Sequence, residues 1–266
     1  MHLRFLLILA VVLYCLWGLF LYAYQRDFMY LPVSERAHAY LVEQFLSEGE
    51  TIQVVVLNPG RPDAVMYFGG NAEAVVANAP GFLHSLPQHT VYLVNYRGYA
   101  GSSGTPTEQG LYADALNFHD AIRDRHRGIA VIGRSLGSGV ATFLAAERPI
   151  SRLVLVTPFD SLLRLAQDLY PIYPLSLLLH DRYDSYSRVD RIDAPTLLVL
   201  AEHDRVIPGK YAERLLSAFP PGQARAETLD GVGHNGLSAR AEYYALLARF
   251  LKGASKNRHS RAGGNL

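Results

Sequence analysis

The chain opens with an unbroken run of uncharged, mainly apolar positions from Phe5 to Tyr24. These 20 residues are enough to cross about 30 Å of hydrocarbon as a helix. The run is longer than the apolar centre of a cleaved signal, which is the alternative, and it ends in aromatic residues suited to the headgroup level. A buried core helix is less favoured because all faces are apolar. We therefore predict an uncleaved membrane anchor over residues 1–27.

The charges that flank this anchor determine its orientation poorly. Arg4 lies on one side, and Arg26 and Arg36 lie near the other. We expect the amino terminus to lie inside, which places the rest of the chain on the extracytoplasmic side of the membrane.

After the anchor, short apolar runs alternate with amphipathic segments. The runs that predict strands are Thr51–Leu57, Ala64–Phe68, Val91–Asn95, Ile129–Ile132, Leu153–Val156, Thr196–Leu200 and Ala226–Leu229. The segments that predict helices are Ala72–Leu86, Glu108–Arg125, Leu136–Glu147, Gly209–Phe219 and Ser238–Leu251. This order predicts an α/β fold over residues 28–252, with a mostly parallel sheet covered by helices on both faces.

Three further segments refine this organisation. Thr105–Glu108 reads as a capping box, with proline at the first helical position. Residues 159–193 interrupt the alternation with prolines, leucines and tyrosines and no strand candidate, so we expect an insertion that forms a lid. Residues 253–266 are polar and lack periodicity, and we expect a disordered tail there.

Composition and charge narrow the possible partners. The net charge is +1, and no clustered basic face of the kind that binds nucleic acid is present, so we expect no nucleic-acid partner. Cys15 is the one cysteine and lies within the anchor, which rules out an intramolecular disulfide and a cysteine-based metal site. The oligomeric state stays open.

The motif Gly133-Arg134-Ser135-Leu136-Gly137 stands between a predicted strand and a predicted helix. A tight turn at this place strains the backbone of the central residue, and the glycines on either side avoid collisions. The hydroxyl of Ser135 would project from the sheet edge at the positive end of the new helix, where negative charge develops during acyl transfer. We therefore predict Ser135 as a nucleophile, the alternative being a glycine-rich turn with an idle serine.

A serine nucleophile needs a base, and the base needs an orienting acid. His234 lies in a glycine-rich loop between the last predicted strand and the last helix, and His203 is its main rival. Asp204 follows the strand Thr196–Leu200, which gives the order serine, aspartate, histidine; Glu202 and Asp230 are competitors for the acid. The predicted catalytic residues are therefore Ser135, Asp204 and His234.

The same chemistry requires two amide donors for the oxyanion. The residue after the nucleophile, Leu136, supplies the first. The strand Ala64–Phe68 runs into a Gly-Gly turn, after which the amide of Asn71 is the best candidate for the second, although such a turn is also a plain connector. This set needs neither metal nor nucleotide, so we predict no cofactor.

Together these segments resemble the α/β-hydrolase superfamily, and more narrowly its membrane-anchored serine hydrolases, the α/β-hydrolase-domain or serine-aminopeptidase-like proteins. The resemblance runs from Gln25 to about Leu251. The motifs that carry it are Gln25–Pro32, Asn95–Tyr99, Gly101–Gly104, Gly133–Gly139, Thr157–Ser161, and Asp204 with Pro208. It implies hydrolysis of an ester, thioester or amide, with a small molecule or an acyl chain as substrate.

Two departures from the family pattern matter. Relatives commonly read His-Gly-Asn-Ala where this chain has Gly69-Gly70-Asn71-Ala72, so the imidazole that supports this loop is absent. The region before Ala64 is also short, and we expect the first strands to be truncated. The altered loop motivates a rival reading, a catalytically inactive hydrolase fold that binds partners at a membrane. Acyl transfer to an acceptor other than water would use the same residues.

Overall fold

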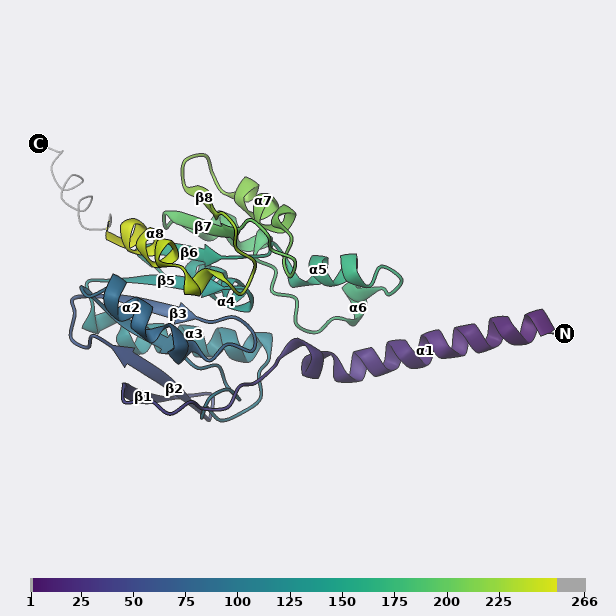
Figure 1. Ribbon diagram of the computed structural model, residues 1–266. Helices are drawn as coiled ribbons and strands as arrows, with labels where there is room; N and C mark the ends of the chain where they lie inside the picture. Colours follow the sequence, from purple (N-terminus) through teal and green to yellow (C-terminus); the bar gives the residue numbers. More distant parts are fainter. Residues whose placement is uncertain (1, 253–266) are drawn as a thin grey trace, which may run out of the picture.

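The centre of the structure is one eight-stranded sheet. It is seen in a computed structural model that describes residues 2–252, so the predicted tail at 253–266 lies outside the described residues (Figure 1). The strands are β1 Leu41–Ser47, β2 Glu50–Leu57, β3 Asp63–Phe68, β4 His89–Val94, β5 Gly128–Arg134, β6 Arg152–Val156, β7 Thr196–Ala201 and β8 Ala224–Leu229. Their order is β1-β2-β4-β3-β5-β6-β7-β8, and every pair from β4 to β8 is parallel. The prediction of a mostly parallel sheet is confirmed.

The first two strands form an antiparallel hairpin, and β2 in turn pairs antiparallel with β4. The expectation of truncated first strands is therefore wrong. The sequence reading missed β1 because its polar and apolar positions alternate weakly, and Leu46 is exposed on it. The hairpin turn is built by Glu48 and Gly49, whose φ angles of 50° and 85° give the twist that two-residue hairpins favour.

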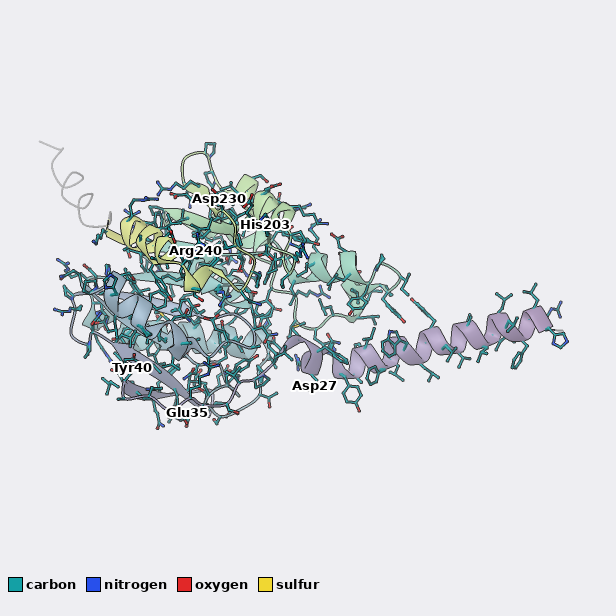
Figure 2. All side chains as sticks on the ribbon, viewed as in Figure 1. Asp27, Glu35, Tyr40, His203, Asp230 and Arg240 are labelled. Carbon is teal, nitrogen blue, oxygen red and sulfur yellow. The ribbon has the colours of Figure 1, made fainter. Side chains whose placement is uncertain are left out.

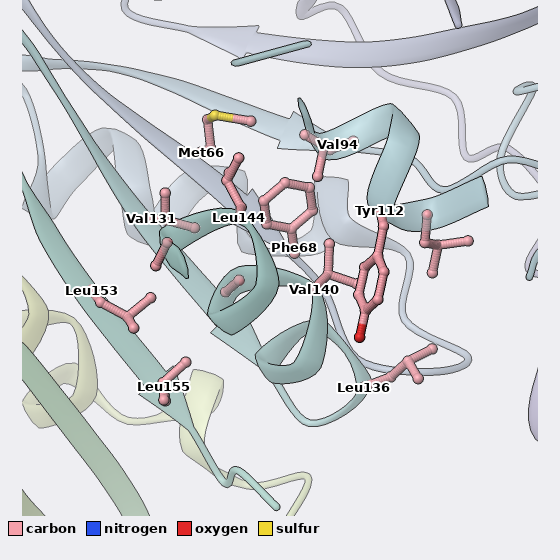
Figure 3. Close-up of a cluster of buried hydrophobic side chains, with 14 of the residues drawn as sticks. Met66, Phe68, Val94, Tyr112, Val131, Leu136, Val140, Leu144, Leu153 and Leu155 are labelled. Carbon is pink, nitrogen blue, oxygen red and sulfur yellow. The ribbon is translucent and has the colours of Figure 1, made fainter. Parts of the chain in front are cut away.

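Helices cover both faces of the sheet. The α-helices are α1 His2–Met29, α2 Ala79–Ser85, α3 Glu108–Ile122, α4 Leu136–Glu147, α5 Leu162–Leu169, α6 Leu175–Leu178, α7 Gly209–Ala218 and α8 Ala241–Lys252. One apolar cluster joins α3, α4 and α7 to the sheet, and a second joins α2 and α8 to the opposite face. Along β3, Met66 and Phe68 belong to the first cluster, drawn in Figure 3, whereas Val65 and Tyr67 belong to the second. This alternation explains the continuous apolar run of β3, because both of its faces are buried.

One predicted helix begins elsewhere, and one predicted helix cap differs. The predicted helix Ala72–Leu86 is a 3-10 turn, Val75–Asn78, followed by α2. Pro80 lies in the first turn of α2, where its missing amide breaks no intrahelical hydrogen bond. The capping box at Thr105 is also wrong. The cap of α3 is Thr107, whose hydroxyl accepts from the amide of Gly110 at 3.0 Å. The Glu108 carboxylate instead accepts from the amides of Arg182 and Tyr183.

Helix α1 projects away from the sheet, and Asp27 lies where it joins the rest of the chain (Figures 1 and 2). Of the helices within residues 2–252, α1 is the one that is long and apolar enough to cross a membrane, and none of its residues is buried. Beside it lies the insertion, residues 159–193, which contains α5, α6 and the 3-10 helix Tyr186–Arg191. The remaining 3-10 helices are Arg123–Arg125 and Leu237–Ala239.

Candidate active site

Ser135 occupies the turn between β5 and α4. Its φ of 51° and ψ of −116° are costly for a residue with a side chain, and the neighbouring chain makes this turn possible only with glycine on either side. A Cβ at Gly133 would lie 2.2 Å from the carbonyl oxygen of Gly137, and a Cβ at Gly137 would lie 2.2 Å from that of Phe68. The Ser135 amide donates to the carbonyl of Val156 at 2.9 Å, which ties the turn to β6.

Three predicted side chains meet at this turn. The Oγ of Ser135 lies 3.0 Å from Nε2 of His234, and Nδ1 of His234 lies 2.8 Å from Oδ2 of Asp204. An imidazole with its proton on Nδ1 therefore donates to Asp204 and accepts from the Ser135 hydroxyl. The three residues come from loops at the carboxyl ends of parallel strands, which is where open α/β sheets place their sites.

The Asp204 carboxylate is buried and fully engaged. Its other oxygen, Oδ1, accepts from the amides of Val206 and Ile207 at 2.9 and 2.8 Å. Burial acts to raise the pKa of this carboxyl, but the hydrogen bonds from His234 and from the two amides outweigh burial and lower the pKa below its ordinary value. The carboxylate therefore stays ionised and accepts the hydrogen bond from Nδ1 of the ring.

Arg134 and Glu73 form a buried ion pair that the sequence reading missed. The two side chains are about nine-tenths buried, and Nη1 of Arg134 lies 2.9 Å from Oε2 of Glu73. Nη2 of Arg134 also donates to the backbone carbonyl of His234 at 3.1 Å, so this arginine holds the histidine loop against β5. A weak signal was available, because Arg134 is the second residue of the glycine-serine motif.

Glu73 supports the loop that carries the second predicted oxyanion donor. Its carboxylate accepts from the amide of Gly70, the hydroxyl of Tyr67 and the side chain of Asn78, each at 2.6 Å. The hydroxyl of Tyr96 donates to the carbonyl of Gly69 at 2.7 Å. A Cβ at Gly69 would lie 2.6 Å from Val75, so the absent imidazole has no space here and Glu73 with Tyr96 holds the loop instead.

Asn71 links this loop to the chain that leaves α1. Its side-chain amide donates to the carbonyl of Met29 at 2.7 Å, and its Oδ1 accepts from the amide of Leu31 at 2.9 Å and the hydroxyl of Tyr99 at 2.8 Å. The next residue, Ala72, has a φ of 56°, a left-handed conformation that these contacts hold. Leu136, the other predicted donor, is the first residue of α4.

A cavity of about 430 Å³ opens at the Ser135 turn. Within residues 2–252 it is lined by Arg36, Gly70, Asn71, Ala72, Glu73, Ala74, Ala77, Asn78, Arg134, Ser135, Val206, His234, Asn235 and Ser238. This volume suits a small molecule or part of a longer one. The insertion contributes no residue to this described lining, and its role as a lid stays a prediction.

The rival residues lie outside this cavity. His203 is 65% exposed, and its ring lies 3.6 Å from Glu202. Glu202 accepts from the amide of Gly231, and Asp230 is exposed on the same loop; His203 and Asp230 are labelled in Figure 2. In the described part of the chain, no group of three or more histidine, cysteine or acidic side chains is placed to hold a metal ion.

Comparisons with known proteins agree with this fold. Residues 53–177 match the family model described as the alpha/beta hydrolase fold. The structure overlays on an esterase of Pyrococcus furiosus with a TM-score of 0.67 and 17% identity, over 85% of this chain and 98% of that one. It also overlays on a monoacylglycerol lipase of Paleococcus ferrophilus with a TM-score of 0.60 and 18% identity, over 77% and 99%. The chain therefore has the α/β-hydrolase fold, which these structures share.

Particular relatives are found by sequence. An uncharacterized protein of Mycobacterium tuberculosis is 38% identical over 182 residues, which are 66% of this chain and 64% of that protein. The chain thus spans slightly less than two thirds of the length of the mycobacterial protein. The protein bem46 of Schizosaccharomyces pombe is 26% identical over 87% of both chains. The human alpha/beta hydrolase domain-containing protein 17B is 29% identical over 60% of this chain and 56% of its own.

Proposed function

We propose that this protein is a membrane-anchored serine hydrolase that cleaves an ester, thioester or amide bond. The observation that carries the proposal is the pair of hydrogen bonds on His234, 3.0 Å to Ser135 and 2.8 Å to Asp204. In this proposal α1 spans the membrane and the substrate enters the cavity at the Ser135 turn.

The proposed reaction begins when Oγ of Ser135 attacks the carbonyl carbon of the substrate and Nε2 of His234 accepts the hydroxyl proton. Asp204 stabilises the resulting imidazolium. The negative charge on the former carbonyl oxygen is held by the amides of Leu136 and Asn71. His234 then gives its proton to the leaving group as the bond to it breaks, which leaves an acyl group on Ser135. A water molecule, activated by the same imidazole, releases this acyl group as a carboxylic acid.

The first test replaces the proposed nucleophile. We expect Ser135→Ala to abolish labelling by a fluorophosphonate probe and to lower turnover of activated esters by at least about a thousandfold. Ser217→Ala is the matched control, because Ser217 is exposed on α7 and its hydroxyl bonds only locally to the carbonyl of Arg214. Labelling of Ser135→Ala at the level of the parent protein would exclude Ser135 as the nucleophile. Failure of the parent to label or turn over any ester would favour the inactive binding protein.

A further inference from the structure

The insertion carries an uncharged apolar tip. Residues 169–179 contain no charged side chain, and large apolar side chains on this tip are exposed, with Ile172 at 68% and Leu177 at 80%. Charged residues bracket it: Asp168 bonds to Lys210 and Tyr211 of α7, and Asp181 lies just beyond the other end. A contiguous apolar surface of this kind marks a contact with another apolar phase.

The tip packs against the middle of α1. The rings of Tyr14 and Tyr173 stack with centroids 4.7 Å apart and an angle of 8° between their planes. The Tyr14 hydroxyl donates to the carbonyl of Ile172 at 2.7 Å, and the Tyr173 hydroxyl donates to the carbonyl of Tyr14 at 3.3 Å. A side chain at Gly18 would meet the Tyr173 ring at 2.9 Å, so glycine at this position allows the contact.

The contacts between the insertion and α1 become more polar toward the domain. The Gln25 side chain donates to the carbonyl of Leu178 at 3.1 Å and accepts from the amide of His180 at 2.8 Å. The next residue, Arg26, pairs with Asp181 at 2.9 Å. Uncharged residues of the tip thus lie beside the uncharged part of α1, and charged residues of the insertion lie beside the charged end of α1.

This arrangement places the tip at a defined depth if α1 spans a bilayer. Tyr14 is ten residues before Tyr24, where the uncharged run ends, and a helix rises about 15 Å over that length, roughly half the thickness of the hydrocarbon. Irregular backbone at this depth must find hydrogen bonds inside the protein, because lipid offers none. The carbonyls of Ile172 and Leu178 find theirs on Tyr14 and Gln25 of α1.

A buried network fixes the tip relative to the domain. Oδ2 of Asp181 accepts from Arg26 and from the Tyr30 hydroxyl at 3.2 Å, and its Oδ1 accepts from the amide of Glu108 at 3.2 Å. The hydroxyls of Tyr30 and Tyr183 lie 2.8 Å apart. The end of α1, the base of the tip and the start of α3 are therefore joined at one carboxylate.

We propose that residues 169–179 insert into the bilayer beside α1 and dock the domain on the leaflet nearest to it. This inference rests on the membrane anchor of the proposed function. The occupant of the apolar surface is the acyl region of the lipid. The domain is then held with its cavity near the interface, since residues 29–31 bond to Asn71 and Arg36 lines the cavity. Substrates presented by the bilayer itself, namely acyl esters of lipids or of lipidated molecules, suit this placement.

The test measures the environment of single labelled cysteines in the full chain, reconstituted in phosphatidylcholine vesicles. Leu177→Cys in a Cys15→Ser background carries an environment-sensitive fluorophore on the tip. Leu46→Cys in the same background is the matched control, because Leu46 is 76% exposed on β1, the edge strand of the sheet, which is not part of the insertion. The native Cys15, which is free and exposed on α1, reports on the anchor.

We expect lipids with a quencher on the acyl chain to quench the labels at Cys15 and at position 177 by at least about twofold, and to leave the label at position 46 unchanged. Aqueous iodide should quench only the label at position 46. Iodide quenching at position 177 with lipid quenching at Cys15 would overturn this inference alone. A label at position 177 protected from both quenchers would mean that a protein covers the tip, which also overturns it. The absence of lipid quenching at Cys15 would overturn the proposal that α1 is a membrane anchor. Fluorophosphonate labelling of Ser135 tests the hydrolase activity separately.

Discussion

At the residue scale, the site depends on backbone positions that accept no side chain. Gly137 packs against the carbonyls of Phe68 and Gly69, so that β3 and α4 approach closely beneath Ser135. The strained turn at Ser135 is held because the chain on both sides is buried and hydrogen-bonded. Local backbone geometry and packing therefore determine where the proposed nucleophile stands.

The close approach at Gly137 gives a prediction about stability. Gly137→Ala should lower the free energy of unfolding by about 2 kcal/mol or more, because the added methyl group meets backbone atoms that cannot yield. Gly209→Ala is the matched control, since a Cβ there meets only the flexible end of Glu213 at 3.8 Å. Thermal unfolding in detergent compares the two variants, and equal midpoints would contradict the prediction.

The Asp204 carboxylate gives predictions for activity and for pH. Asp204→Asn removes the charge that stabilises the imidazolium and should lower kcat by about 10⁴-fold.

Because the pKa of Asp204 in the folded protein lies below the ordinary value of 3.8, ionised Asp204 stabilises the fold above pH 3.8, and this contribution is lost as the pH falls through the folded pKa. The difference in unfolding temperature between the parent and Asp204→Asn should therefore shrink below about pH 4. A difference that grows on acidification would contradict this sign.

At the scale of elements, helix starts and loops are fixed by specific side chains. Thr107 caps α3, while Glu108 turns away from the helix end to bind two amides of the insertion. A sequence pattern of threonine followed three residues later by glutamate matches either arrangement locally. Tertiary contact decides for the second arrangement, because the buried amide of Tyr183 and the neighbouring amide of Arg182 both donate to the Glu108 carboxylate.

The two threonines before α3 provide the corresponding test. Thr107→Ala should destabilise the protein by about 1 kcal/mol, as the loss of a helix cap does, whereas Thr105→Ala at an exposed position should change stability by less than about 0.5 kcal/mol. Chemical denaturation in detergent measures both. A larger effect at Thr105 would restore the capping box expected from sequence.

At the scale of the whole molecule, α1 stands apart from the apolar clusters of the domain. No residue of α1 is buried, but Tyr30, just after its end, is 3% exposed and belongs to the main apolar cluster. The domain therefore draws its stability from residues after the helix. Asn71 and Asp181 connect the helix exit to the cavity loop and to the insertion.

Removal of the helix tests this division. Deleting residues 2–24 should leave the unfolding temperature of the domain within about 4 °C of the parent, because the two apolar clusters stay complete. Tyr30→Ala in the full chain should lower it by more, since truncating a buried aromatic costs about 3–5 kcal/mol. Differential scanning fluorimetry compares them, and a larger loss from the deletion would place α1 within the folding unit.

The sequence by itself determined features that short-range periodicity and turn chemistry encode. These are the uncharged span of α1, the alternation of strands and helices, and the glycine-bounded turn at Ser135. The sequence also indicated Asp204 and His234 as partners of Ser135, because the carboxyl ends of parallel strands meet at one edge of a sheet. The sequence did not predict β1, because the apolar and polar residues of this strand alternate only weakly. Its pairing with β2 makes it a strand.

Only the tertiary structure decided which distant residues share one contact. The pairing of Arg134 with Glu73 joins residues 61 positions apart, and that of Arg26 with Asp181 spans 155 positions. No local pattern marks such partners, because a buried charge is stabilised by whatever the fold brings beside it. The sequence of the insertion predicts a lid, because it contains no sign of the residues that the insertion contacts. In the structure, the stacking of Tyr173 on Tyr14 places the tip of the insertion along α1.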